Sequence, residues 1–69
     1  MSYLLKTPNN EYLRLSYNAV RDCMVPTLIP QRFMNVFTYA AEWRTKSQAQ
    51  KALQRFAPTF PSLTVVQEQ

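Results

Sequence analysis

The sequence predicts an α+β fold, in which one amphipathic helix packs on a small, mainly antiparallel sheet of about four strands. Two observations support this prediction. A capped stripe of apolar residues at helical spacing lies between Thr45 and Phe56, and β-like runs separated by turn residues lie on both sides of it. The expected order is a β-hairpin, a long loop, a strand, the helix and a closing strand.

Residues 3–6 and 12–16 are predicted to form the β-hairpin, around the turn cluster at residues 7–11. The chain has no glycine, and Asn tolerates the left-handed backbone region that hairpin turns use, so Asn9 and Asn10 are expected to close the turn. Along the second strand, the side chains should point alternately to two faces. One face carries Leu13, Leu15 and Tyr17, and the other carries Tyr12, Arg14 and Ser16.

Residues 18–34 are predicted to form a long loop, because Pro26 and Pro30 disfavour a helix interior or a central strand. The segment is nevertheless rich in apolar side chains, and long loops without secondary structure are uncommon in compact domains. Two interpretations stay open. The favoured one is that the loop covers the core, and the other is that it presents apolar surface to a partner.

Residues 35–43 are predicted to form the third strand, since the run from Val36 to Tyr39 consists of residues that favour β structure. Trp43 ends this strand, and a side chain of its size is expected to anchor the helix in the core. If the third and closing strands run parallel, they form a right-handed crossover with the helix between them.

The helix is predicted from Thr45 to Phe56. Thr45 and Gln48 have the spacing of a capping box, in which the hydroxyl accepts a hydrogen bond from the backbone N–H three residues later. Pro58 disfavours any continuation of the helix, and residues 63–67 are expected to form the closing strand. The expected core contains Leu5, Leu13, Leu15, Val36 or Phe37, Ala49, Leu53, Phe56, Leu63 and Val65.

The composition limits the class of protein. The 69 residues should form a single domain, 1–69, with a small core, and a homodimer is one way in which such a domain gains stability. No apolar run approaches the length of a membrane helix, so no membrane association is expected. The single cysteine, Cys23, excludes an internal disulfide and favours a reducing compartment, so a cytoplasmic location is expected.

No enzyme, cofactor or metal site is predicted. The chain has no His, and its 4 acidic residues are widely spaced, so the sequence indicates neither a nucleophile–base pair nor paired catalytic carboxylates. Arg21 lies near Cys23 in the sequence and could activate its thiol, but a buried and inert cysteine is the favoured interpretation. A binding protein is therefore expected.

Two binding hypotheses stay open. The first is a protein or protein–nucleic-acid complex as partner, because Arg, Met and aromatic residues are enriched in interfaces. Its predicted contact residues are Leu28, Ile29, Arg32, Phe33, Met34 and Arg44. The alternative is direct binding of DNA or RNA, because the net charge is +4 and basic residues alternate with aromatic ones, although these charges do not cluster into a run. Its residues are Tyr12, Arg14, Tyr17, Arg21, Arg32, Lys46, Lys51 and Arg55.

The pattern resembles small phage and prophage accessory proteins, which typically have a strand ending in Ala-x-x-aromatic, a capped helix with repeated alanines and a last strand rich in valine. The matching residues are Ala40, Trp43, Thr45, Ala49, Ala52, Leu53, Val65 and Val66. The loop 18–34 departs from this pattern. The resemblance implies a small inhibitor or adaptor that acts on a host macromolecule in the host cytoplasm. Some phage inhibitors of host RNA polymerase and some anti-CRISPR proteins are similarly small α+β domains.

Overall fold

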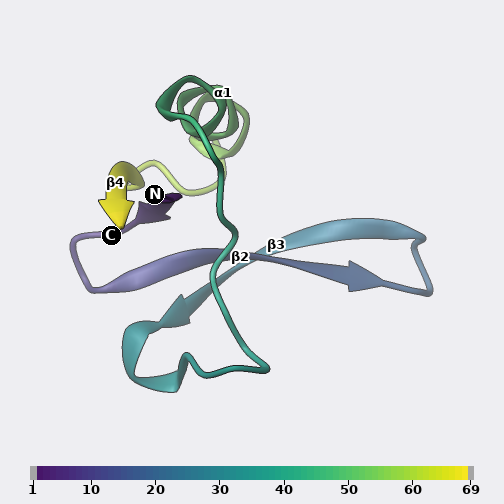
Figure 1. Ribbon diagram of the computed structural model, residues 1–69. Helices are drawn as coiled ribbons and strands as arrows, with labels where there is room; N and C mark the ends of the chain where they lie inside the picture. Colours follow the sequence, from purple (N-terminus) through teal and green to yellow (C-terminus); the bar gives the residue numbers. More distant parts are fainter. Residues whose placement is uncertain (1, 69) are drawn as a thin grey trace.

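The computed structural model describes residues 2–68 and shows one helix packed on a four-stranded antiparallel sheet (Figure 1). In chain order the elements are β1 (Ser2–Lys6), β2 (Glu11–Asn18), β3 (Cys23–Pro30), the 3-10 helix η1 (Gln31–Phe33), α1 (Lys46–Phe56) and β4 (Thr64–Glu68). The strand order is β3-β2-β1-β4, so β3 and β4 form the edges. The predicted α+β fold is confirmed.

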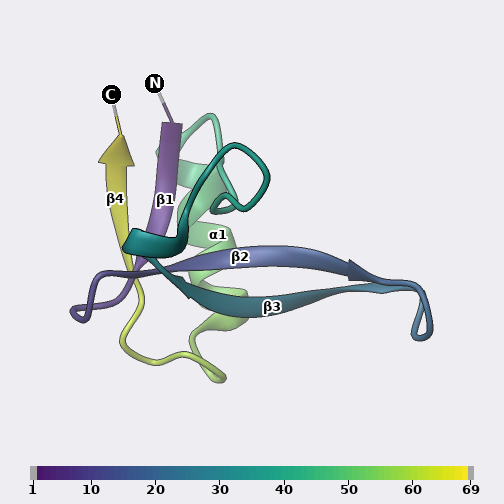
Figure 2. The same ribbon diagram turned by 90° about the horizontal axis from the view of Figure 1, so that it is seen from below.

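The sheet consists of two antiparallel ribbons that meet at one point. β2 and β3 pair along their full length of 8 residues, whereas β1 and β4 pair along their full length of 5 residues. β1 and β2 pair only where Lys6 lies opposite Tyr12, close to the turn that joins them. Beyond that pair the ribbons diverge, and Figure 2 shows β2 and β3 crossing β1 and β4 at a large angle and extending past α1.

Residues 41–43 lie in the opening between the diverging strands. The Ala41 N–H donates to the Leu13 carbonyl of β2 at 3.0 Å, while Tyr3 of β1 and Trp43 exchange two backbone hydrogen bonds of 2.9 and 3.0 Å. Backbone groups of β1 and β2 that do not bond to each other therefore find hydrogen-bond partners in this segment. Trp43 also packs against the core, as predicted.

α1 lies across β1 and β4 and closes the main core (Figure 1). The Thr45 hydroxyl accepts a hydrogen bond from the Gln48 N–H at 3.1 Å, so the predicted cap is present, and Ala49 is fully buried against the sheet. The buried centre consists of Leu5, Leu13 and Leu63, against which Leu28, Trp43, Ala52, Leu53, Phe56, Phe60 and Val65 pack. Across residues 2–68, no helix has the length and apolar character needed to cross a membrane.

The opposite face of the sheet is covered by residues 31–40, which Figures 1 and 2 place on the side away from α1. Leu4 and Ile29 point to this face, since each is the sequence neighbour of a strand residue that packs toward the helix. Both are buried, together with Ala40. The sheet thus has a thin second apolar layer that the core prediction did not include.

Two turn residues take the conformation that glycine usually adopts. Asn10 closes the predicted hairpin between β1 and β2 with φ of 59°, and Asp22 has φ of 49° in the turn between β2 and β3. Asn and Asp enter this left-handed region more readily than other residues with a side chain. Asn18 supports the second turn, because its side-chain oxygen accepts hydrogen bonds from the N–H groups of Val20 and Arg21 at 3.0 and 3.1 Å.

The prediction of a loop at 18–34 is wrong, because β3 lies inside that segment. Its prolines are tolerated because β3 is an edge strand. The Gln31 N–H donates to a carbonyl of the β1–β2 turn at 2.9 Å, so the nitrogen of the preceding Pro30 points to the free edge. Pro26 lies four residues earlier in the strand and points the same way, so neither proline removes a hydrogen bond from the ladder.

The predicted third strand at residues 35–43 is also wrong, since this segment is irregular apart from the bridge at Trp43. Val36 and Phe37, one of which was expected in the core, are 82% and 85% exposed. The chain makes a tight turn at Asn35 instead of extending along a strand. The right-handed crossover that was expected if the third and closing strands ran parallel is absent, because residues 35–43 form no strand and β4 pairs with β1 instead.

Candidate partner-binding surfaces

The residues predicted to bind a protein partner do not form one surface. Ile29 is only 7% exposed, and Leu28 is partly buried against the core, so neither belongs to an exposed surface shared with the other predicted residues. Both belong to β3, and neighbouring residues of a strand point to opposite faces of the sheet. Leu28 therefore points to the core under α1, and Ile29 points to the apolar layer on the other face. The other four are the exposed Arg32 and Phe33 and the half-buried Met34, all after β3, and the exposed Arg44 before α1.

The residues of the nucleic-acid alternative are also divided between faces. Arg14 points away from α1 and contacts the backbone of Tyr39, whereas Lys51 and Arg55 lie on α1. Arg21 lies in the turn at the far end of the β2–β3 ribbon. The structure therefore does not bring the basic residues into one continuous patch. The remaining residues of this set are Tyr12 and Tyr17 of β2, Arg32 of η1 and Lys46 of α1.

Four exposed apolar side chains lie close together along the chain on the face away from α1, between the last residue of η1 and the bridge at Trp43. We call residues 33–39 the aromatic turn. Within these seven residues Phe33, Val36, Phe37 and Tyr39 are 58%, 82%, 85% and 61% exposed. Sequence reasoning selected Phe33 but assigned the other three to a strand, so the candidate surface differs from the predicted one.

The side chain of Asn35 fixes the shape of the aromatic turn. Its oxygen accepts hydrogen bonds from the N–H groups of Phe37 at 2.8 Å and Thr38 at 2.9 Å. The backbones of Asn35 and Thr38 also bond to each other, through N–H to carbonyl contacts of 2.8 and 3.3 Å. Asn commonly closes turns by such side-chain bonds. Val36 and Phe37 therefore stand at the tip of a turn with a defined backbone.

Both ends of the aromatic turn are attached to the rest of the protein. At one end, the Arg14 guanidinium donates from Nη1 to the Tyr39 carbonyl at 2.9 Å and lies 5.6 Å from the centre of the Tyr39 ring. At the other end, the Met34 N–H donates to the Gln31 carbonyl at 3.1 Å. The Arg32 guanidinium lies 4.9 Å from the centre of the Phe33 ring. The surface is thus apolar with two cations at its margins.

A second surface, which we call the basic groove, lies between α1 and β2 on the helix side of the sheet. It is a hollow of about 510 Å³. Its lining consists of Leu15 of β2, residues Glu42, Trp43 and Arg44, and Gln48, Lys51, Ala52, Arg55 and Phe56 of α1. Three of these side chains are cationic and one is anionic, so the groove combines apolar lining with net positive charge.

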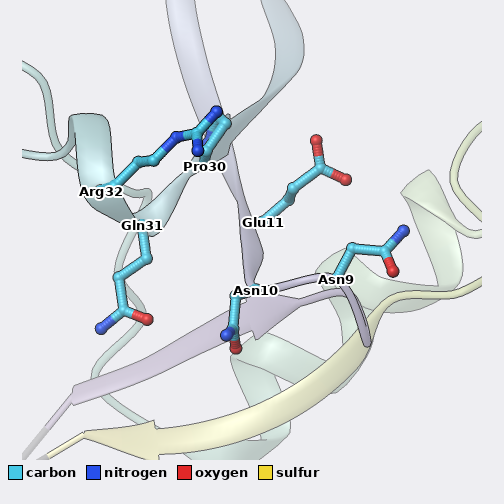
Figure 3. A pocket seen from close by; sticks show the side chains of 6 residues that line it. All are labelled: Asn9, Asn10, Glu11, Pro30, Gln31 and Arg32. Carbon is cyan, nitrogen blue, oxygen red and sulfur yellow. The ribbon is translucent and has the colours of Figure 1, made fainter.

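Another hollow, of about 660 Å³, lies beside the β1–β2 turn and is lined mainly by polar side chains (Figure 3). It is lined by Asn9, Asn10, Glu11, Pro30, Gln31 and Arg32. Figure 3 shows its amide, carboxylate and guanidinium groups spread around the opening, without convergence on one point. Nowhere in residues 2–68 do acidic or cysteine side chains gather in a group that could hold a metal ion. We assign no chemistry to this hollow.

The far end of the β2–β3 ribbon contains a hydrogen bond between two side chains and an exposed cysteine. The Tyr17 hydroxyl donates a hydrogen bond to the Asp22 carboxylate. This bond, together with a smaller contribution from desolvation, raises the pKa of Tyr17 above its ordinary value. Cys23 is exposed, so the favoured prediction of a buried cysteine is wrong. It was based on an average tendency of the residue type, whereas here Cys23 lies where the ribbon has left the core.

Comparisons with known proteins do not place this chain in a family. No protein-family model matches it, and no curated protein and no solved structure matches it either. The resemblance to phage accessory proteins therefore stays a prediction. The function has to be inferred from the surfaces themselves.

Proposed function

We propose that this chain is a non-enzymatic binding protein, an inhibitor or adaptor, that contacts a partner protein through the aromatic turn. The supporting observation is a run of exposed apolar side chains on a fixed backbone, with Phe37 and Val36 at its tip. Single exposed apolar residues are ordinary on protein surfaces, but contiguous apolar patches mark sites of interaction.

The geometry of the aromatic turn suits protein recognition. Binding energy in interfaces is concentrated in a few aromatic and Arg side chains. Because the Asn35 hydrogen bonds already hold the turn, little backbone entropy would be lost when a partner binds. Arg14 and Arg32 lie at the margin, where exposed charges select among partners and affect the rate of association.

Direct binding of DNA or RNA is the weaker alternative. Bases stack on aromatic rings whose faces are free. The guanidinium groups of Arg14 and Arg32 already lie over the rings of Tyr39 and Phe33. Of the remaining basic residues in this set, Lys46, Lys51 and Arg55 lie on α1 and Arg21 lies in the turn at the far end of the β2–β3 ribbon, so the whole set forms no single track that a phosphate backbone could follow.

The test is capture of a partner from bacterial lysate, with and without nuclease, by the wild-type chain and two variants. Phe37→Ser removes the side chain at the tip of the aromatic turn. Val20→Ser is the matched control, because Val20 is 96% exposed but lies in the distant β2–β3 turn. We expect a stoichiometric protein that survives nuclease, is retained by Val20→Ser and is lost with Phe37→Ser. Capture that disappears with nuclease, or that is equally weak in both variants, would contradict the proposal.

A second variant tests the rigidity of the turn separately from its contacts. Asn35→Ala keeps all four apolar side chains but removes the hydrogen bonds to Phe37 and Thr38. We expect the affinity for the captured partner to fall about tenfold, because the turn must then be ordered on binding. Titration calorimetry with the purified partner measures this change. An unchanged affinity would show that the conformation of the turn does not matter for recognition.

A further inference from the structure

We propose that the basic groove is a second docking site and that it takes an acidic amphipathic helix of a partner protein. This site is independent of the aromatic turn, which lies on the other side of the sheet. The groove has the form of a corner. One side of α1 forms its wall, and the helix-facing side of β2 forms its floor.

The wall is a regular stripe along the helix. Gln48, Lys51, Ala52 and Arg55 all line the groove. Their spacing of three and four residues places them above one another on one face of α1. This face adjoins the buried face of the helix, since Ala52 contacts the core as well as the groove. A second helix laid beside α1 would meet this stripe along its length.

The floor is apolar and continues beyond the helix. Leu15 lines the groove, and Pro26 lies opposite it in β3. The next pair on the same face of the ribbon is Tyr17 and Met24, which are 61% and 54% exposed. Figure 2 shows the β2–β3 ribbon extending past α1, so no other element of residues 2–68 lies over this part of the floor. The floor is therefore a ledge on which an apolar stripe can pack.

The charges around the groove are unbalanced. Arg44, Lys51 and Arg55 face one carboxylate, that of Glu42, whose oxygen accepts a hydrogen bond from the Ser2 hydroxyl at 3.2 Å. Within residues 2–68, the side chains of Arg44 and Lys51 form no hydrogen bond, ion pair or ring contact, and the Arg55 side chain only lies over the Phe56 ring, 5.5 Å from its centre. Carboxylates of a bound segment would complement these cations.

Charge and shape together select the occupant. A second copy placed groove to groove would bring two sets of three cations together, which is unfavourable. Single-stranded nucleic acid would need free aromatic faces, but Trp43 packs against the core and the Phe56 ring lies under Arg55. An amphipathic helix with leucines on one face and glutamates on its flanks satisfies both the floor and the rim.

The test uses three fluorescent probes in anisotropy titrations with the full chain. The first is a synthetic amphipathic helical peptide with leucines on one face and glutamates on the other. The second replaces every glutamate by glutamine, and the third is oligo(dT). We expect the acidic peptide to bind at least about tenfold more tightly than either of the others. Equal affinity for the two peptides, no binding of the acidic peptide, or tighter binding of oligo(dT) would overturn the proposal.

A pair of matched variants locates the site. Lys51→Glu and Lys46→Glu make the same charge change at exposed positions of α1, but only Lys51 lines the groove. We expect Lys51→Glu to weaken acidic-peptide binding about tenfold and Lys46→Glu to weaken it less than about twofold. Equal losses would indicate general attraction between charges and would overturn the proposal. Phe37→Ser should leave peptide binding unchanged, so loss in that variant would move the contact to the aromatic turn and reject the groove.

Discussion

The two ribbons of the sheet differ in how much of the protein packs on them. The β1–β4 ribbon lies under α1, and its Leu5 belongs to the buried centre. The β2–β3 ribbon is longer, but it reaches that centre only at one end, through Leu13 and the opposite residue Leu28. Its other end extends past α1 as a two-stranded projection. One sheet therefore contains a supported part and a projecting part.

This difference separates the residues that hold the fold from those that are available for binding. Apolar side chains under α1 are removed from water and stabilise the protein, whereas Tyr17 and Met24 stay more than half exposed. An isolated two-stranded ribbon is marginally stable, so the projecting part depends on the supported part to hold its shape. Apolar side chains that add little to folding are the ones left to contact a partner.

The largest effect should come from shortening leucines in the two parts. Leu13 and Leu15 lie two residues apart on the same face of β2, but Leu13 is fully buried and Leu15 is half-buried at the edge of the groove. We expect Leu13→Ala to lower the free energy of unfolding by about 3 kcal/mol, because it leaves a cavity in the core. Leu15→Ala should cost about 1 kcal/mol, because water can fill the space. Urea denaturation followed by circular dichroism measures both.

One result would contradict the expected difference between these two variants. If Leu15→Ala destabilised the protein as much as Leu13→Ala, the projecting part of β2 would be as tightly packed as the supported part. The basic groove would then not be an accessible surface. A smaller loss of unfolding free energy for Leu15→Ala than for Leu13→Ala, with the fold retained, would support the distinction between the two parts.

A smaller effect should follow from removing the helix cap. Thr45→Ala deletes the hydrogen bond from the Gln48 N–H and leaves that donor without its partner at the start of α1. We expect a loss of about 1 kcal/mol in the free energy of unfolding. Thr45→Ser retains a hydroxyl acceptor and serves as the control, so most of the stability should return with it. Equal destabilisation by Ala and Ser would mean that the cap contributes nothing and that packing alone holds the helix.

Local signals in the sequence were sufficient for the elements that depend on local interactions. The helix followed from the cap at Thr45 and the apolar spacing, and the first hairpin followed from Asn10, whose left-handed conformation the structure confirms. The apolar residues Leu5, Leu13 and Leu63 were also placed correctly in the core. These features need no knowledge of which strands are neighbours.

The third strand could not be placed, because its position depends on strand order. Pro26 and Pro30 argue against a central strand but not against an edge, and the sequence does not state which strand is at the edge. The aromatic turn could not be predicted either, because local propensity alone does not decide between a strand and a turn. Val36 and Phe37 have high β propensity, but the hydrogen bonds of Asn35 close a turn around them. An Asn at the start of such a run is the signal that could have indicated the turn.

The basic groove could not be predicted from the sequence for a related reason. Its lining comes from β2, from residues 42–44 and from α1, and only the diverging ribbons bring these segments together. Lys51 and Arg55 were selected as candidate contacts, but for nucleic acid. Leu15 was expected in the core because the alternation along β2 places it on the same face as Leu13. The sequence does not show how far along β2 the helix covers that face.

The smallest effect concerns the tip of the projecting part, where the Tyr17 hydroxyl donates to Asp22. That bond raises the pKa of Tyr17, so the folded protein favours the protonated phenol more than the unfolded chain does. Its contribution to stability is therefore present below the ordinary tyrosine pKa of 10.0 and is lost as pH rises through the higher folded-state value. The difference in unfolding free energy between wild type and Tyr17→Phe should be small at neutral pH and should shrink above about pH 10.

Spectrophotometric titration gives the matching measurement on the folded protein. Asp22→Asn removes the carboxylate that favours the protonated phenol, while Asn still tolerates the positive φ at this position. We therefore expect Tyr17 to ionise at lower pH in Asp22→Asn than in wild type. A Tyr17 titration that is the same in both proteins would mean that the contact is not maintained in solution. The projecting ribbon would then be more mobile at its tip than the structure indicates, and Tyr17 would be free to turn toward a segment bound on the ledge beside it.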